Sequence, residues 1–265
     1  SLGDFLDMTD RMTFQEVLGT MRQRADRLAE LTKALAKNLD EGLEADAFQA
    51  GLFAKADLSS GLVSELTSLQ GIVGSEYGRR SGLPEDVCYA IETHYSYEVN
   101  CPAESRREKL GMCLTMADQL DKVAGYLGID LAPSGSSDPF ALRRAVTILI
   151  ESGYPGTLLP FFEQAGQGYR MQGLPHDAEK ASQHLEAVLA GRYQVAFEEI
   201  RHDVVEASMP GSLSELFDSS YVAARVESLA MVADDAAFVQ SATRPINIIT
   251  SALSKGEEIE FSGWD

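Results

Sequence analysis

Residues 106–127 read RREKLGMCLTMADQLDKVAGYL, and this stretch decides the fold class. Its apolar residues recur every three or four positions, which is the period of one face of an α-helix. The residues on that face are Leu114, Ala117, Leu120, Ala124 and Leu127. Gly128 ends the pattern, as glycine commonly does just past a helix. The stretch therefore predicts a long helix with one side in the core.

Helical spacing continues on the N-terminal side of this stretch. Apolar residues from Phe14 to Leu39 keep a spacing of three to four, which predicts one long amphipathic helix. Pro84, Glu85 and Asp86 open a further helix, with proline in the first turn and acids against the helix dipole. Helices are therefore also predicted in both segments on the N-terminal side.

The C-terminal side has the same character. Asp138 is expected to cap a helix whose first position is Pro139. Further helices are expected at residues 156–172, 176–191, 192–208, 212–232 and 236–253. Since no segment shows the alternation of a half-buried strand, the sequence predicts an all-α fold.

The break at residues 152–155 is the best candidate for a domain boundary, because glycine and proline cluster there. It divides the chain into residues 1–152 and 153–265. A helix could still pack across this boundary.

Composition indicates a folded protein with a difficulty for nucleic-acid binding. Of the 265 residues, 45% are hydrophobic, which is enough to fill a core. However, 41 acidic and 22 basic residues give a formal net charge of -19, which repels RNA in bulk. Any phosphate contact must therefore depend on a local basic patch.

The sequence predicts neither a membrane span nor a disulfide framework. The longest apolar stretch is far too short to cross a bilayer, and no secretory signal pattern is found. Cys88, Cys101 and Cys113 cannot all pair with one another and match no zinc pattern, so we expect reduced thiols. A cytoplasmic location, with no membrane contact, is the expectation.

A series of sequence blocks is similar to those of one known family. They are Phe14-Gln-Glu-Val-Leu-Gly-Thr20, Lys55-Ala-Asp-Leu58 with Leu69-Gln-Gly-Ile-Val-Gly-Ser-Glu-Tyr77, Ala90-Ile-Glu-Thr-His-Tyr95, Met116-Ala-Asp-Gln-Leu-Asp-Lys122, and Pro133-Ser-Gly-Ser-Ser-Asp-Pro-Phe-Ala-Leu-Arg-Arg144. They resemble "FxExLGT", "KADL … LQGxMGxxYA" and "PTGSxDPFALRR" of the β subunit of the bacterial two-subunit glycyl-tRNA synthetase. The resemblance implies an HD-like helical domain over residues 1–152.

The resemblance is weaker downstream. It rests there on Asp203-Val-Val-Glu-Ala-Ser208, Tyr221-Val-Ala-Ala-Arg-Val-Glu-Ser-Leu229 and Ala242-Thr-Arg-Pro-Ile-Asn-Ile248. It implies a helical body-tail or anticodon-binding (DALR-like) region, apparently truncated, over residues 153–265. Pro245 departs from the family, which usually has a basic or polar residue there. The family's large N-terminal region has no counterpart, so we expect a fragment or a short form.

HD proteins are metal-dependent phosphohydrolases, but the HD pattern is incomplete here. Asp57 stands at the aspartate of the pair, Ala56 replaces its histidine, and His94 and Asp118 match later ligand positions. One imidazole with two carboxylates is a poor metal site, so we interpret these three residues as relics and expect no metal. His94 lies on an apolar helix stripe, as a core histidine does.

Other histidines and acids have simpler explanations. The pairs His176-Asp177 and His202-Asp203 are predicted to be surface groups. Asp118, Asp121 and Lys122 share one helix face, where an ion pair is the simplest account.

The candidate tRNA contacts are basic residues. Arg143 and Arg144 lie early in a helix, where the dipole gives a cation no advantage. They suit a phosphate contact, or alternatively an ion pair with Asp118 or Asp121. Further candidates are Arg106, Arg107, Lys109 and Arg244, and a solvated face explains the first three nearly as well.

No phosphate-binding glycine loop and no synthetase ATP motif occurs in the sequence, so we expect neither a catalytic residue nor a cofactor in this chain. The resemblance implies a partner α subunit that uses ATP and Mg, with this chain contacting tRNA(Gly) rather than DNA and supporting assembly of the ligase. Two alternatives stay open: an HD-type phosphohydrolase with a metal near Asp57, His94 and Asp118, and a structural helical module without RNA affinity.

Overall fold

The computed structural model describes residues 1–96, 103–237 and 239–241. Helices dominate it, so the all-α prediction is confirmed. The 3-10 turns among the helices are η1 (Thr9–Arg11), η2 (Glu41–Leu43), η3 (Ala56–Ser59) and η4 (Thr67–Leu69). The helices are α1 (Leu2–Met8), α2 (Met21–Leu39), α3 (Glu44–Phe53), α4 (Gly61–Glu65), α5 (Ile72–Arg80), α6 (Glu85–Thr93), α7 (Arg106–Gly128), α8 (Leu142–Ile150), α9 (Leu159–Met171), α10 (Ala178–Ala196), α11 (His202–Ser208), α12 (Leu213–Leu216) and α13 (Ser219–Val232).

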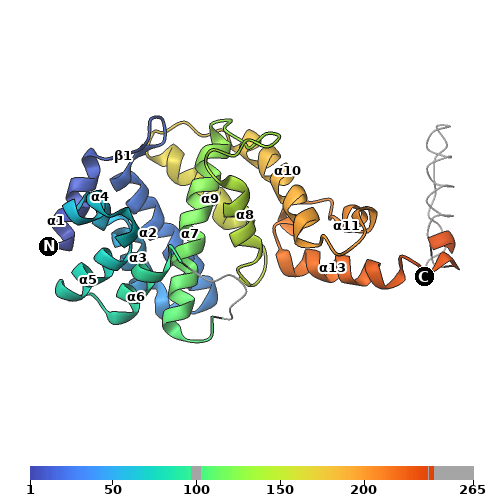
Figure 1. The fold of residues 1–265 in the computed structure, drawn as a ribbon, viewed down its shortest axis with the longest axis horizontal. Helices are drawn as coiled ribbons and strands as arrows, with labels where there is room; N and C mark the ends of the chain where they lie inside the picture. The colour runs from blue at the N-terminus through green and yellow to red at the C-terminus, as the bar shows by residue number, and fades with distance from the viewer. Residues whose placement is uncertain (97–102, 238, 242–265) are drawn as a thin grey trace.

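Helix α7 is the centre of the fold, as its sequence predicts. It runs through the middle of the molecule (Figure 1), and every residue from Leu110 to Gly128 except Lys122 is buried. Helices α2, α3, α6, α8, α9 and α10 all pack against it. Small residues allow this crowding: a Cβ at Gly125 would collide with the Tyr169 hydroxyl. Cys88 and Cys113 are free thiols within this core.

The N-terminal end differs from the prediction. Residues 14–20 were expected to be helical, but β1 (Thr13–Gln15) and β2 (Gly19–Thr20) form a small antiparallel hairpin. Helix α2 begins only at Met21, because Thr20 caps it in a capping box with Gln23. The apolar residue Phe14 therefore reaches the core from a strand rather than from a helix.

Several helix boundaries were also wrong, and the segments expected as single helices over 192–208 and 212–232 are each divided between two helices. Helix α8 begins at Leu142 rather than Pro139, although the Asp138 carboxylate does cap it, accepting from the amides of Leu142 (2.8 Å) and Arg143 (3.0 Å). Helix α10 does not end at Gly191 but continues to Ala196, because a single glycine weakens a helix without stopping it. The helix expected over 236–253 lies largely outside the described residues.

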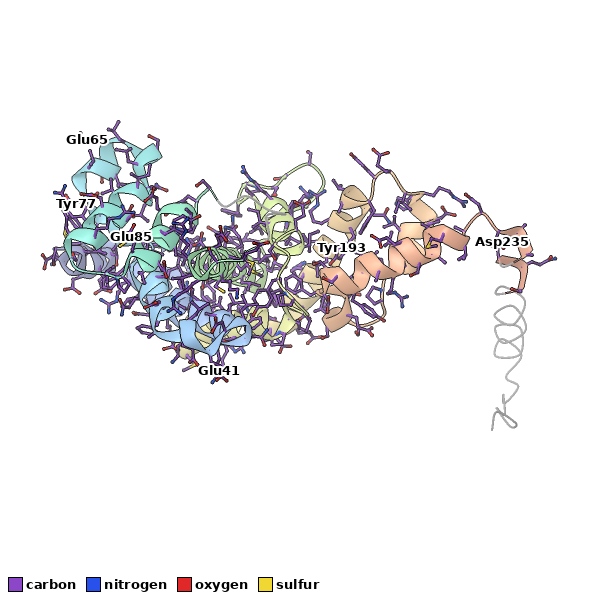
Figure 2. All side chains as sticks on the ribbon, turned by 90° about the horizontal axis from the view of Figure 1, so that it is seen from below. Glu41, Glu65, Tyr77, Glu85, Tyr193 and Asp235 are labelled. Atoms are coloured by element: carbon purple, nitrogen blue, oxygen red, sulfur yellow. The ribbon has the colours of Figure 1, made fainter. Side chains whose placement is uncertain are left out.

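The last helices, α11 to α13, extend to one side of the molecule (Figure 1). Tyr193, near the junction in Figure 2, anchors them through a hydrogen bond from its hydroxyl to the Leu216 carbonyl (2.9 Å). On the other side of the boundary expected at 152–155, α9 packs against α2 and α7. The two-domain division stays a prediction. Among the described residues, no helix is both long and apolar enough to cross a membrane.

Candidate functional site

The three relic HD residues, Asp57, His94 and Asp118, lie near one another, but Asp57 binds backbone amides. Its Oδ2 accepts from the amides of Gly71 (2.7 Å) and Gly74 (3.1 Å), and thereby fixes the start of α5. Gly71 has φ 81°, and a Cβ there would press on the Ile91 carbonyl, so the turn requires glycine. Burial raises the pKa of Asp57 against these hydrogen bonds.

Lys55 occupies the place between the other two relic residues. Its Nζ lies 3.0 Å from Asp118 Oδ1 and 2.9 Å from His94 Nε2, and 4.0 Å from the centre of the Tyr95 ring. The side chain is only 3% exposed. His94 Nδ1 lies 2.7 Å from the Ile91 carbonyl, so the proton belongs on Nδ1, and Nε2 accepts from the ammonium. His94 is thus a hydrogen-bonded core histidine, as predicted.

Burial and the charges around Lys55 shift three pKa values. Burial, opposed by Asp118, lowers the pKa of Lys55 to about 8. Burial and the Lys55 charge lower the pKa of His94 to about 3, so the imidazole stays neutral. Burial alone would raise the pKa of Asp118, but Lys55 and Arg24 hold it well below its usual range.

Two arginines of α2 complete a cluster that we call the buried ion cluster: Arg24, Arg27, Lys55, Asp118 and Asp121. Arg24 lies 3.0 Å from Asp118 and 3.3 Å from Asp121. Arg27 donates to both Asp121 oxygens, at 2.6 and 3.2 Å. Helix α2 therefore contacts α7 through two cations, which are three residues apart on α2, and two carboxylates, which are three residues apart on α7.

Aromatic rings seal the buried ion cluster from water. Arg24 stacks over Phe14 at 4.0 Å and Arg27 over Tyr169 at 3.7 Å. The Tyr169 hydroxyl donates to Asp121, whose side chain is fully buried. Burial opposes the charged guanidinium, yet the carboxylates keep the pKa of both arginines raised. The cluster therefore acts as a structural joint between α2 and α7.

The donor set does not fit a divalent metal. A metal would need the lone pairs of His94 Nε2 and Asp118, and the Lys55 ammonium already takes both. Within the described residues, no group of three or more His, Cys, Asp or Glu side chains is placed to hold a metal ion. We therefore derive no metal-dependent step for this chain.

Two ion pairs considered for Asp118 and Asp121 do not form. Neither acid pairs with Arg143 or Arg144, because Arg24 and Arg27 of α2, and Lys55 just before η3, already pair with them. Asp118 also makes no ion pair with Lys122 among the described residues. An inward-facing carboxylate pairs with cations from neighbouring elements before it pairs along its own helix.

The predicted surface histidines differ from each other. His202 is exposed, as expected. His176 is half-buried: its Nε2 is buried, and the ring fits between Gly128 and Gly166, where a Cβ on either glycine would collide with it. It stacks on Tyr169, which couples it to the edge of the buried ion cluster.

Some of the basic candidates near the start of α7 already have partners within the chain. Arg106 pairs with Asp46 (2.6 Å) and Asp86 (3.4 Å), so an ion pair accounts for it. Arg107 lies 4.9 Å from the Tyr89 ring centre. Lys109 lines a groove of about 760 Å³ toward α13, with no ion-pair partner among the described residues. This cluster offers at most two cations to a ligand.

Hydrogen bonds to neutral carbonyls orient Arg143, and these carbonyls do not compensate its positive charge. It donates to the carbonyls of Gly135 (2.7 Å) and Ser137 (3.4 Å), so the loop before α8 orients the guanidinium. Arg144 is exposed, and neither arginine has an acidic partner in the described part of the chain. Arg244 lies outside the described residues.

Sequence reasoning missed the roles of Lys55, Arg24 and Arg27. A signal was present for the arginines, since Arg24 is three residues after Met21 and four before Leu28, on the same buried stripe of α2. A cation on an apolar stripe predicts a buried partner. Nothing in the sequence singles out Lys55 beyond its place in the block at 55–58.

We expect acid to destabilise the protein through His94. Because its folded pKa of about 3 lies below the unfolded value, the unfolded chain takes up the proton first. The stabilisation is complete above about pH 6.5 and falls by about 1.4 kcal/mol per pH unit as pH drops toward 3. Urea unfolding of His94→Gln between pH 4.5 and 7 should lack this contribution.

The control for this experiment is His202→Gln, at an exposed position. It should keep the slope of the unaltered protein. Equal slopes for His94→Gln and the unaltered protein would contradict the assignment of the buried neutral imidazole.

The comparisons with known proteins agree on one family. The family model described as "Glycyl-tRNA synthetase beta subunit" matches residues 1–210. The relative named "Glycine--tRNA ligase beta subunit" from Desulfatibacillum aliphaticivorans is 34% identical, over 97% of this chain and 38% of its own length. Those of Rhodospirillum centenum and Erwinia tasmaniensis are 33% and 30% identical, over 94% and 99% of this chain and 35% and 40% of their own. The chain thus spans about two-fifths of the length of these relatives or less.

Proposed function

The chain belongs to the glycyl-tRNA synthetase β-subunit family, and from this premise we propose that it is a non-catalytic, tRNA-contacting and assembly part of glycine–tRNA ligase. The relatives are named as β subunits of that ligase, which supports a role in attaching glycine to tRNA(Gly). Adenylation, with its ATP and Mg, belongs in this proposal to an α-subunit partner.

The observation that carries the tRNA contact is the placement of Arg143. Loop carbonyls orient its guanidinium, and no carboxylate in the described chain neutralises it. In a protein with a net charge of -19, such a cation is available to a phosphate group. Arg144, exposed beside it, adds a second positive charge.

The phosphohydrolase alternative is not favoured. Its metal would require His94 and Asp118, whose lone pairs Lys55 occupies at 2.9 and 3.0 Å. In this proposal the HD-like part acts as a scaffold, and the buried ion cluster fixes α2 against α7. We also propose that the chain is divided into two parts, residues 1–152 and residues 153–265.

We expect the chain to bind tRNA(Gly) more tightly than an unrelated tRNA. Because the contact is to phosphates, its affinity should fall about ten- to a hundredfold between 50 and 200 mM salt. Fluorescence anisotropy with labelled tRNA over a salt series measures both quantities. Absence of binding to either tRNA would overturn the tRNA-contacting role and leave a structural helical module.

A further inference from the structure

A narrow groove lies between α8, α10 and the loop that follows α7. It has a volume of about 240 Å³. Pro133 and Arg143 form one wall, and His184, Gly191 and Arg192 of α10 form the other. The lining contains two arginines and a histidine but no carboxylate. The groove is therefore a local positive site on an acidic protein.

No carboxylate of the described residues neutralises either arginine. In the described structure, Arg143 donates to two neutral backbone carbonyls, those of Gly135 and Ser137. Arg192 is partly buried, and among the described residues it has neither a hydrogen-bond nor an ion-pair partner. The exposed Arg201, by contrast, is paired with Asp203 and Asp234. Two unpaired guanidinium groups facing one groove favour an anion.

The nearby carboxylates are already engaged. Asp130 accepts from Lys180 (2.9 Å) and lies 2.8 Å from His184 Nε2, so residues of α10 compensate its charge. Asp138 caps α8 through two backbone amides. Neither acid lines the groove.

Gly191 is the residue of the groove that has no side chain. It lies in the interior of α10, where glycine is less stable than alanine. A Cβ there would meet no atom of the described residues within 4 Å, so their packing does not require a glycine. Here its missing side chain keeps the groove open between the two arginines.

We infer that this groove binds one backbone phosphate group of tRNA, with Arg143 and Arg192 as its donors, an inference that rests on the proposed function. The guanidinium fork matches two phosphate oxygens. The groove is smaller than typical small-molecule pockets of about 300–1,000 Å³, which suits a single phosphate group. His184, fixed by Asp130, shapes the wall beside Arg192.

The test uses the full chain with labelled tRNA(Gly) over a salt series. Arg192→Ala is expected to weaken binding about tenfold near 0.1 M salt and to reduce the salt slope by about one. Arg143→Ala should do the same. Because both arginines bind the same phosphate, the double variant should also lose only about one from the slope. Gly191→Met fills the groove without changing charge and should weaken binding while leaving thermal stability equal or higher.

The matched control is Arg201→Ala, which removes an exposed but paired arginine and should leave binding unchanged. Circular dichroism identifies any variant that has lost its fold. Arg192→Ala and Gly191→Met remain informative if Arg143→Ala disturbs its loop. If Arg192→Ala and Gly191→Met both bind tRNA normally, the phosphate-binding role of the groove is overturned, but the proposed function is not. No binding by the unaltered chain would overturn both.

Discussion

Asp121→Asn is expected to lower the free energy of unfolding by about 3–5 kcal/mol, because it leaves buried arginines without their counter-charge. The Asp121 side chain is fully buried and lies 2.6 Å from Arg27 and 3.3 Å from Arg24. The asparagine amide would also point a donor at groups that donate. Urea unfolding at pH 7, followed by circular dichroism, measures the loss.

The control for this variant is Asp130→Asn. Asp130 also pairs with a cation, but it is 55% exposed, so its loss should cost less than about 1 kcal/mol. If the two variants cost the same, the buried ion cluster does not stabilise the fold as argued. Arg27→Met with Asp121→Leu, which replaces the pair by apolar side chains, should regain part of the loss.

Lys55→Met is expected to cost about 2–4 kcal/mol, because Asp118 keeps Arg24 but loses its second cation. The substitution keeps an unbranched side chain that is one atom shorter and carries no charge. Combining it with Asp118→Asn should cost less than the sum of the single changes, with a coupling of about 1–3 kcal/mol. A double-mutant cycle in urea measures this coupling.

A second readout separates charge from packing at Lys55. The ammonium helps to hold the pKa of His94 near 3, so its removal should raise the His94 pKa toward its ordinary value. An NMR titration of the imidazole resonances follows this shift. Lys180→Met, at an exposed lysine, should leave both stability and the His94 resonances nearly unchanged. An unmoved His94 pKa in Lys55→Met would contradict the direct ammonium–imidazole contact.

The local pattern predicted much of the fold. Helices α6 and α7 lie where their apolar periods and caps place them, because each signal resides within a few residues. The errors at residues 14–20 and at the start of α8 have one cause. Phe14 and Pro139 fit a helix by sequence spacing, but a hairpin and an extended loop satisfy the same burial once their neighbours are packed.

The candidate site was predicted only in part. Asp57, His94 and Asp118 do lie close together, and His94 is a core residue as expected. The fate of Arg143 was open between a ligand and an acid, and the structure decided against Asp118 and Asp121. The groove that Arg143 shares with Arg192 could not be foreseen, since the sequence placed a helix end between Gly191 and Arg192.

By itself, the sequence determined the helical class, the core of α7 and the family, because helix periods and motif blocks are properties of short segments. Only the tertiary structure decided which charges meet. Arg24 and Asp118 are 94 residues apart in the chain, as are Arg27 and Asp121, and no local pattern specifies such a distance. Packing α2 against α7 removes these groups from water, so each cation must find a carboxylate across the interface. Arg143 and Arg192 lie at the surface instead, where no such requirement forces a pairing and their charge stays free for a ligand.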